Sequence, residues 1–220
     1  MSKIKFLKSK WLRRSLLTVL GLLLATVIYG LLQLIEPIGI AEVAPNATVQ
    51  FTGQALLIAS DADMVATAYA DAKLDRVAGV EDALSVATLP LDSSAPAVSS
   101  VPVSNSVMSW PQIIAVSPDG QRAYVVEVRS RPDDGIQEFD DIDQMPEGRT
   151  LTVVDISDPV RPEIVESVDV GRNPEHVSIS SDGRYLAVNL VDPGRELLIV
   201  QLQADGRLGK RWYFPFQSEG

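Results

Sequence analysis

The chain has no cysteine and one histidine, His176, among its 220 residues. The lack of cysteine excludes disulfide bonds, thiolate zinc sites and cysteine nucleophiles. The sequence also has no glycine-rich phosphate loop, no paired-histidine metal motif and no Gly-x-Ser-x-Gly nucleophile elbow. We therefore predict no cofactor and no metal site, and we assign no catalytic residue from sequence motifs.

Acidic residues are missing from residues 1–14, which hold six lysines and arginines. The other 13 basic residues face all 29 acidic ones, so the chain after residue 14 carries a formal charge of −16. A region with this excess of negative charge repels nucleic acid. We expect no nucleic-acid partner.

Charged residues are also missing from residues 15–35. A helix of ~20 apolar residues crosses the ~30 Å hydrocarbon core, so we predict a transmembrane signal-anchor helix embedded in the lipid bilayer over 15–35. No basic residue follows until Lys73. This asymmetry predicts a cytoplasmic segment 1–14, a linker 36–53, and a periplasmic or extracellular remainder. Cleavage of a signal peptide at the small-x-small residues 39–41 is the alternative.

Beyond the linker, the chain repeats itself. PQIIAVSPDGQRAYVVE at 111–127 aligns without a gap with PEHVSISSDGRYLAVNL at 174–190, at an offset of 63. Weaker matches align 149–157 with 195–203, 84–90 with 151–157 at an offset of 67, and, weakest of all, 56–60 with 113–117. We divide residues 54–220 into three copies, 54–110, 111–173 and 174–220.

Each copy is predicted to hold four short strands. Asp119-Gly120 and Asp182-Gly183 are hairpin turn signals, which explains both aspartates without a catalytic role. The second and third strands of the second copy are apolar on both faces, as in a sheet packed on both sides. Four-stranded antiparallel blades of this kind build β-propellers. We predict an all-β fold, a partial propeller of about three blades, because a closed ring needs at least ~4 blades. We therefore expect the chain to be the N-terminal part of a longer protein, or the product of a truncated reading frame.

The repeats resemble a known family. SPDGQRAYVVE and SSDGRYLAVNL resemble the turn-and-second-strand signature of YVTN-type and lactonase-like seven-bladed propellers. VGRNPEHVSISSDG resembles the junction between their blades, and LTVVDISDPVRPEIV is similar to the LVIVD repeat of exported bacterial propellers. The resemblance implies the architecture and allows lactone hydrolysis as an activity. The family often carries Pro-x-His at this junction, which here is Pro174-Glu175-His176.

Two connections are predicted to meet on one face of the propeller, namely the junction 171–174 and the acidic segment 129–148. The candidate ligand-face residues on them are Arg172, Asn173, His176, Asp133, Asp134, Asp140, Asp141 and Asp143. His176 is either a general base or a strand-start residue without a chemical role, and we favour the second interpretation. The acidic segment is either a Ca²⁺ site or an extended, solvated loop. Its spacing lacks the order of a calcium loop, which favours the solvated loop.

Two functions remain open. The first is a binding or scaffolding module of the cell envelope, which presents one propeller face to a protein or a small ligand. The alternative is a lactonase-like hydrolase acting on a sugar lactone. The predicted location favours the binding module, because sugar-phosphate lactones are cytoplasmic metabolites.

Overall fold

A computed structural model describes Arg14 and residues 17–21, 23–26, 53–62, 68–92, 95–106 and 112–216. The chain divides into two units, Met1–Gln50 and Phe51–Gly220. The described residues between 14 and 26 are helical. Within the described residues, no helix combines the length and the apolar character needed to cross a bilayer. Most of the predicted anchor, the cleavage site and the linker lie outside the described residues, so these remain predictions.

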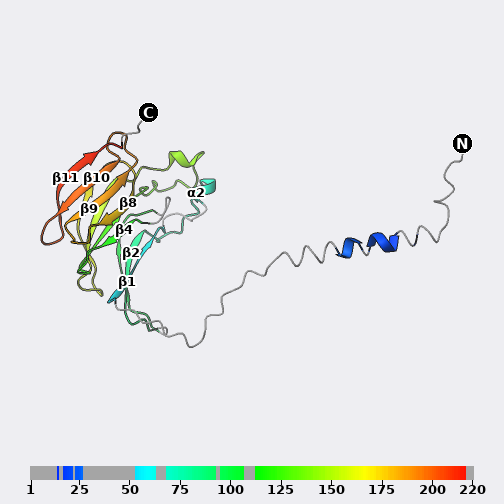
Figure 1. Cartoon of the computed structure of the whole chain (residues 1–220), viewed down its shortest axis with the longest axis horizontal. Helices are drawn as coiled ribbons and strands as arrows, with labels where there is room; N and C mark the ends of the chain where they lie inside the picture. Colours follow the sequence, from blue (N-terminus) through cyan, green and yellow to red (C-terminus); the bar gives the residue numbers. More distant parts are fainter. Residues whose placement is uncertain are drawn as a thin grey trace. The chain divides into compact units, whose positions relative to one another are not determined.

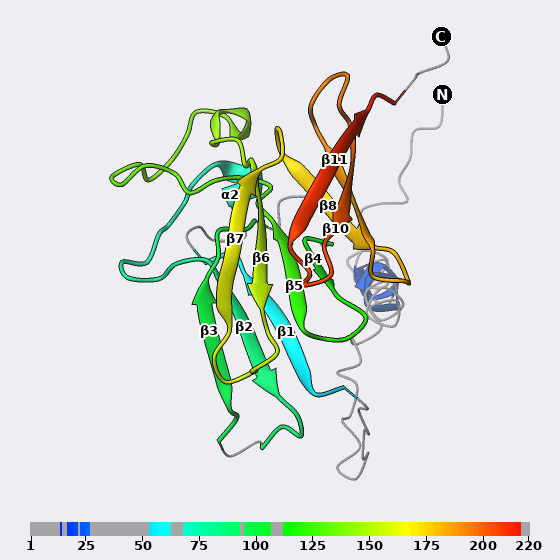
Figure 2. The same cartoon turned by 90° about the vertical axis from the view of Figure 1, so that its left-hand side faces the viewer.

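In the part of the chain that the structure describes, eleven strands form three antiparallel sheets (Figures 1 and 2). The first sheet contains β1 (Ala55–Ser60), β2 (Ala83–Thr88) and β3 (Val98–Pro102). The second contains β4 (Ile114–Val116), β5 (Arg122–Val126), β6 (Thr150–Asp155) and β7 (Glu163–Asp169). The third contains β8 (Pro174–Ile179), β9 (Tyr185–Leu190), β10 (Leu197–Leu202) and β11 (Leu208–Phe214). Two short helices, α2 (Ala68–Asp71) and η2 (Ile142–Gln144), lie in connections. The all-β class is confirmed.

The second sheet is packed on both faces. Along β5, Tyr124 and Val126 belong to the core shared with the third sheet, whereas Ala123 and Val125 belong to the core shared with the first. Side chains alternate between the faces of a strand, so an apolar run supplies both cores. This arrangement agrees with the prediction for the second copy. The outward face of the third sheet exposes Tyr185 and Phe214, 37% and 47% accessible, as expected for the last sheet of an arc.

The hydrogen-bonded register shows how the repeats correspond. Ala55 pairs with Thr88, and Arg122 pairs with Asp155. The first two sheets are therefore related by an offset of 67 residues, the same offset that aligns 84–90 with 151–157. We call it the repeat offset. The β2–β3 and β6–β7 pairings follow it as well. β1 is therefore equivalent to β5, and the alignment of residues 56–60 with 113–117, the first strand of the second copy, is wrong. Small apolar residues fit any strand, whereas hydrogen bonding to the next strand specifies one register. The described residues thus give the first sheet three strands rather than the predicted four.

Alternating strand directions separate the connections into two ends. The turn end includes the tight turns 117–121, 180–184 and 203–207 and the β6–β7 connection 156–162. The loop end includes 68–82, 127–149, 170–173 and the β9–β10 connection 191–196. α2 and the β5–β6 connection lie together at the top of Figure 2. The candidate residues of the acidic segment and of the junction therefore lie at the same end of the sheets.

Candidate functional site

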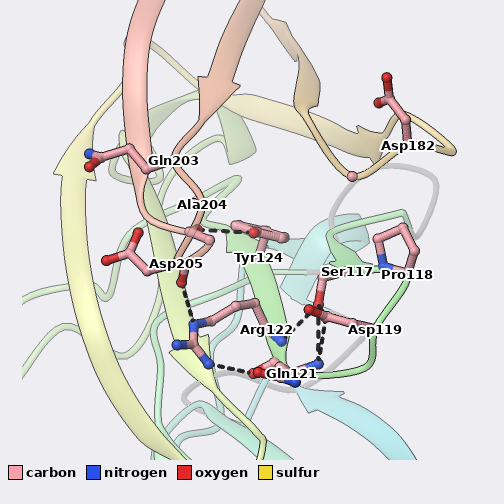
Figure 3. A pocket seen from close by; sticks show the side chains of 12 residues that line it. Ser117, Pro118, Asp119, Gln121, Arg122, Tyr124, Asp182, Gln203, Ala204 and Asp205 are labelled. Atoms are coloured by element: carbon pink, nitrogen blue, oxygen red, sulfur yellow. Dashed lines mark hydrogen bonds between the residues drawn. The ribbon is translucent and has the colours of Figure 1, made fainter.

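A pocket of about 230 Å³ opens at the turn end, between the second and third sheets (Figure 3). The turns of three hairpins line it, and each turn contributes an aspartate: Asp119, Asp182 and Asp205. Each aspartate precedes a glycine with positive φ. Glycine adopts this backbone conformation without strain, so the Asp-Gly pairs form the hairpins of the repeat.

The carboxylates in this pocket are engaged in their own turns. Asp119 Oδ1 accepts hydrogen bonds from Ser117 Oγ at 2.6 Å and Gln121 N at 3.0 Å. Those bonds, that from Ser117 above all, hold the pKa of Asp119 below its usual value. Asp182 accepts equivalent bonds from Ser180 Oγ and Arg184 N, and its pKa falls to about 2. The interpretation of both aspartates as turn residues agrees with these contacts.

The remaining polar groups of the pocket tie the two sheets together. Arg122 Nη1 lies 3.0 Å from Asp155 Oδ1, and Arg122 Nε donates to the carbonyl of Asp205 at 3.1 Å. The Tyr124 hydroxyl donates to the carbonyl of Gly206 at 3.0 Å, and burial raises the pKa of Tyr124 to about 12. The bonds from Arg122 and Tyr124 to the β10–β11 turn join the second sheet to the third, so the residues that line this pocket stabilise the sheet–sheet contact.

The loop end carries a chain of ion pairs on the surface. Glu147 Oε1 lies 2.9 Å from Arg172 Nε, and its other oxygen lies 4.0 Å from Arg149. Arg149 Nε donates to Asp169 at 2.8 Å, which lowers the pKa of Asp169. The side chains are 42% exposed for Arg172 and 46% for Glu147, but Arg172 Nε itself is buried, and among the described residues its contact with Glu147 is an ion pair without hydrogen-bond geometry. Sequence reasoning missed Glu147, although its place at the end of the acidic segment was a usable signal.

Asn173 occupies a constrained position beside this pair. Its φ is 42° and it is 6% exposed. Its N–H donates to the carbonyl of Gly148 at 2.8 Å, so the junction is bonded directly to the end of the acidic segment. Within the described part of the chain, Asn173 Oδ1 is buried without a hydrogen-bond partner. Such an acceptor is normally satisfied by a water or by a ligand hydroxyl.

His176 makes its contacts with residues outside this cluster. It pairs with Asn189 across β8 and β9 and forms a parallel bridge with Gln112. Its neighbour Val177 belongs to the core between the second and third sheets, so His176 points to the opposite face of β8. In the described part of the chain, His176 makes no side-chain hydrogen bond or ion pair. These contacts favour the interpretation as a strand-start residue.

The acidic segment is folded rather than extended. Met145, 2% exposed, packs with Ala68 and Leu74 in a small core of its own. Leu74 N donates to the carbonyl of Gln137 at 2.8 Å, and Phe139 N donates to that of Ala72 at 3.0 Å. We call residues 68–76 together with 129–148 the acidic cap. The expectation of an extended loop is wrong, because apolar residues between the acids pack against the β1–β2 connection, whereas the acids themselves are exposed to solvent as expected.

The acidic candidates lie on the outside of this cap. Asp134, 90% exposed, lies 3.8 Å from Arg76 and 3.3 Å from Arg131. Arg76 also donates to the carbonyl of Asp133. Asp141 caps η2 by accepting from Asp143 N, and Asp140 N donates to Gln144 Oε1. Across the described residues, no group of three or more histidines and acids is arranged to hold a metal ion.

No protein-family model matches the chain, and neither does any curated protein. Among solved structures, it is similar to a periplasmic gluconolactonase of Pseudomonas aeruginosa, with 20% identity over 70% of this chain and a TM-score of 0.38. A proposed 6-phosphogluconolactonase of Bacteroides fragilis shows 18% identity over 61%, with a TM-score of 0.40. A proposed 6-phosphogluconolactonase of Bacteroides uniformis shows 13% over 60%, with a TM-score of 0.29. The chain spans 36%, 36% and 49% of their respective lengths. Likeness at this level assigns no activity to the chain.

Proposed function

We propose that the chain belongs to a lactonase-like propeller that binds and hydrolyses a sugar lactone at the loop end. The observation that supports this most is the partly exposed Arg172–Glu147 pair, 2.9 Å apart, next to Asn173, whose buried Oδ1 has no hydrogen-bond partner among the described residues. A sugar lactone presents a carbonyl and several hydroxyls. These are the groups that a guanidinium and an amide oxygen bind.

Lactone hydrolysis needs a base and a positive group. Water attacks the carbonyl carbon, the bond from that carbon to the ring oxygen breaks, and a proton passes to the ring oxygen. The Glu147 carboxylate would take the proton from the water, and the Arg172 guanidinium would stabilise the negative charge that develops on the carbonyl oxygen. We assign no step to His176, because its side chain leaves β8 on the face opposite to the core.

An extracytoplasmic location does not argue against this activity. The similar protein from Pseudomonas aeruginosa is named a periplasmic gluconolactonase, so lactones are hydrolysed outside the cytoplasm in at least that case. The predicted extracytoplasmic location therefore does not favour a binding module over a hydrolase.

A binding module remains the second candidate, and the acidic cap favours it. A small buried core that contains Met145 holds the cap together, and the cap in turn holds exposed carboxylates such as Asp134 in fixed positions. A fixed negative surface suits a basic partner. This function requires no hydrolysis.

The test mixes the full chain, in detergent, with glucono-δ-lactone in a weak buffer. The release of protons into that buffer measures the rate of hydrolysis. We expect initial rates above the spontaneous rate, and a loss of at least tenfold in kcat/KM for Glu147→Gln and for Arg172→Gln. The control is Arg161→Gln, which breaks the exposed Arg161–Asp158 pair of 3.3 Å at the other end. A wild-type rate equal to the spontaneous rate would overturn the hydrolase proposal. Calorimetric binding of the lactone in that case would support the binding module.

A further inference from the structure

The packing of the first sheet on the second repeats the packing of the second sheet on the third. We call these two interfaces the first and the second contact. Val86 lies in the core of the first contact, and Val153, one repeat offset further on, lies in that of the second. On the facing sheets, Val125 and Val188, which the alignment at an offset of 63 equates, lie in the same two cores. The two contacts can therefore be compared position by position.

Large side chains occupy the turn end of the second contact. Arg122 Nε donates to the carbonyl of Asp205, so this side chain reaches the β10–β11 turn (Figure 3). The Tyr124 hydroxyl donates to the carbonyl of Gly206 in the same turn. Leu186, fully buried at the start of β9, belongs to the same core as Tyr124. Three large side chains thus lie between the second and third sheets at this end.

Smaller residues stand at all three equivalent positions of the first contact. They are Ala55 in place of Arg122, Leu57 in place of Tyr124, and Ala123 in place of Leu186. A cleft of about 300 Å³ opens between the first and second sheets at this end. Smaller side chains leave space that the surrounding backbone closes only in part. The difference between the repeats therefore explains why the cleft exists.

The cleft has apolar walls and one carboxylate. The apolar surface comes from Leu57, Val86, Val116, Pro118, Ile156 and Pro159. Among the lining residues, all in the described part of the chain, only Asp119 is charged. The bonds that Asp119 accepts from Ser117 Oγ and Gln121 N both end on Oδ1, so Oδ2 is available to a ligand. The same bonds lower the pKa of Asp119, so the carboxylate carries its negative charge at neutral pH.

An aromatic ring and a positive charge complement this cleft. An apolar cavity of ~150 Å³ holds a benzene ring, so the cleft has room for a ring with a short side chain. We infer that the cleft binds a small aromatic amine, with its ring against Leu57 and Val116 and its ammonium group beside Asp119. A second copy of the chain is a less favoured occupant, because two chains of the same negative charge repel each other. The cleft lies at the turn end, so this site does not depend on the proposed hydrolysis at the loop end.

Amide chemical shifts of the isotope-labelled full chain in detergent test the site, with 2-phenylethylammonium chloride as the probe. The amides of Leu57 and Gly120 should shift and reach saturation, whereas that of Val188, in the second contact, should not shift. Ethylammonium, which lacks the ring, should shift neither. The uncharged 2-phenylethanol should bind at least threefold more weakly than the amine, because it lacks the attraction to Asp119. No saturable shift at Leu57 and Gly120, or equal shifts throughout the three sheets, would overturn the inference.

Matched substitutions in two equivalent turns test the carboxylate. Asp119→Asn removes the charge but keeps an acceptor for Ser117, and it should weaken binding of the probe at least threefold. Asp182→Asn makes the same change one repeat further on, in a turn that does not line the cleft, and should leave the affinity unchanged. Equal affinities of the two variants would rule out the ammonium site at Asp119.

Filling the cleft gives a second measurement. Leu57→Tyr supplies the ring that Tyr124 supplies in the second contact, so the probe should no longer shift the Gly120 amide. The thermal unfolding temperature should stay the same or rise, because a filled cleft gains contacts. The control is Ile58→Tyr, at a 47% exposed position on the other face of β1, which should keep probe binding. Unchanged binding to Leu57→Tyr would contradict the site. Shifts of the Leu57 and Gly120 amides that depend on protein concentration, without any amine, would instead assign the cleft to a second copy of the chain.

Discussion

Tyr124 donates its hydroxyl hydrogen to the carbonyl oxygen of Gly206 over 3.0 Å, and this bond joins β5 of the second sheet to the β10–β11 turn of the third. Both sheets also share the core that contains Tyr124. The bond therefore lies where two repeats of the chain meet, and it should contribute to the stability of the whole sheet–sheet contact.

Removing that hydroxyl should destabilise the domain. Tyr124→Phe keeps the buried ring but leaves the Gly206 carbonyl without its donor, which costs about 0.5–1.5 kcal/mol of unfolding free energy. Urea unfolding of the full chain measures the change. Tyr185→Phe is the control, since Tyr185 is 37% exposed and should change stability by less than ~0.5 kcal/mol. Equal effects of the two substitutions would show that the bond to Gly206 contributes nothing specific.

The same hydroxyl makes a pH prediction. The pKa of Tyr124 is about 12 in the folded chain against 10.0 for an ordinary tyrosine, because burial disfavours the charged form. Between these values the unfolded chain loses the proton and the folded chain keeps it, so the Tyr124 contribution is full below pH 10 and falls as pH rises towards 12. The unfolding free energy of wild type should therefore decline more steeply than that of Tyr124→Phe over this interval. Parallel pH curves would contradict the raised pKa.

Two glycines with the same backbone conformation allow the cost of backbone strain to be measured separately from the cost of steric crowding. Gly206 and Gly194 both have φ of 81°. A Cβ at Gly206 would lie 2.6 Å from Arg122 Cγ, whereas a Cβ at Gly194 meets no atom within 4 Å. Gly194→Ala should cost about 1–2 kcal/mol from the left-handed backbone alone. Gly206→Ala should cost a further ~1–3 kcal/mol, because Arg122 must move away from Asp155. Thermal unfolding of both variants measures the difference, and equal losses would be the contrary result.

The sequence was informative where one residue determines the local conformation. Asp119-Gly120 and Asp182-Gly183 predicted hairpins, and the structure has both with the same set of hydrogen bonds. The two-faced apolar run of β5 predicted a sheet between two others, because packing on both sides requires apolar residues on both faces. The repeat offset was equally readable, since it aligns strands and turns together.

Predictions from the sequence were wrong where tertiary contacts determine the local structure. The register of β1 depends on its hydrogen bonds to β2, which a short apolar match does not encode. The acidic segment was judged by its charge, but Ile142 and Met145, spaced among the acids, pack against Leu74 from a distant part of the chain. The Glu147–Arg172 pair likewise joins two connections that sequence reasoning had placed on one face without pairing their residues.

The last prediction concerns the acidic cap. Met145→Ala removes the central side chain of its core, and truncation of a buried methionine costs about 2–5 kcal/mol. This core is separate from those between the sheets, so the cap should open by itself. The amides of Leu74 and Phe139, which bond across the cap, should lose hydrogen-exchange protection, while that of Val126 in β5 should keep it. Asp140→Ala, at an exposed position of the same cap, should leave all three amides unchanged. If Met145→Ala leaves Leu74 protected, the cap is held by its polar contacts and not by its core. If Val126 loses protection as well, the cap is an integral part of the folded sheets.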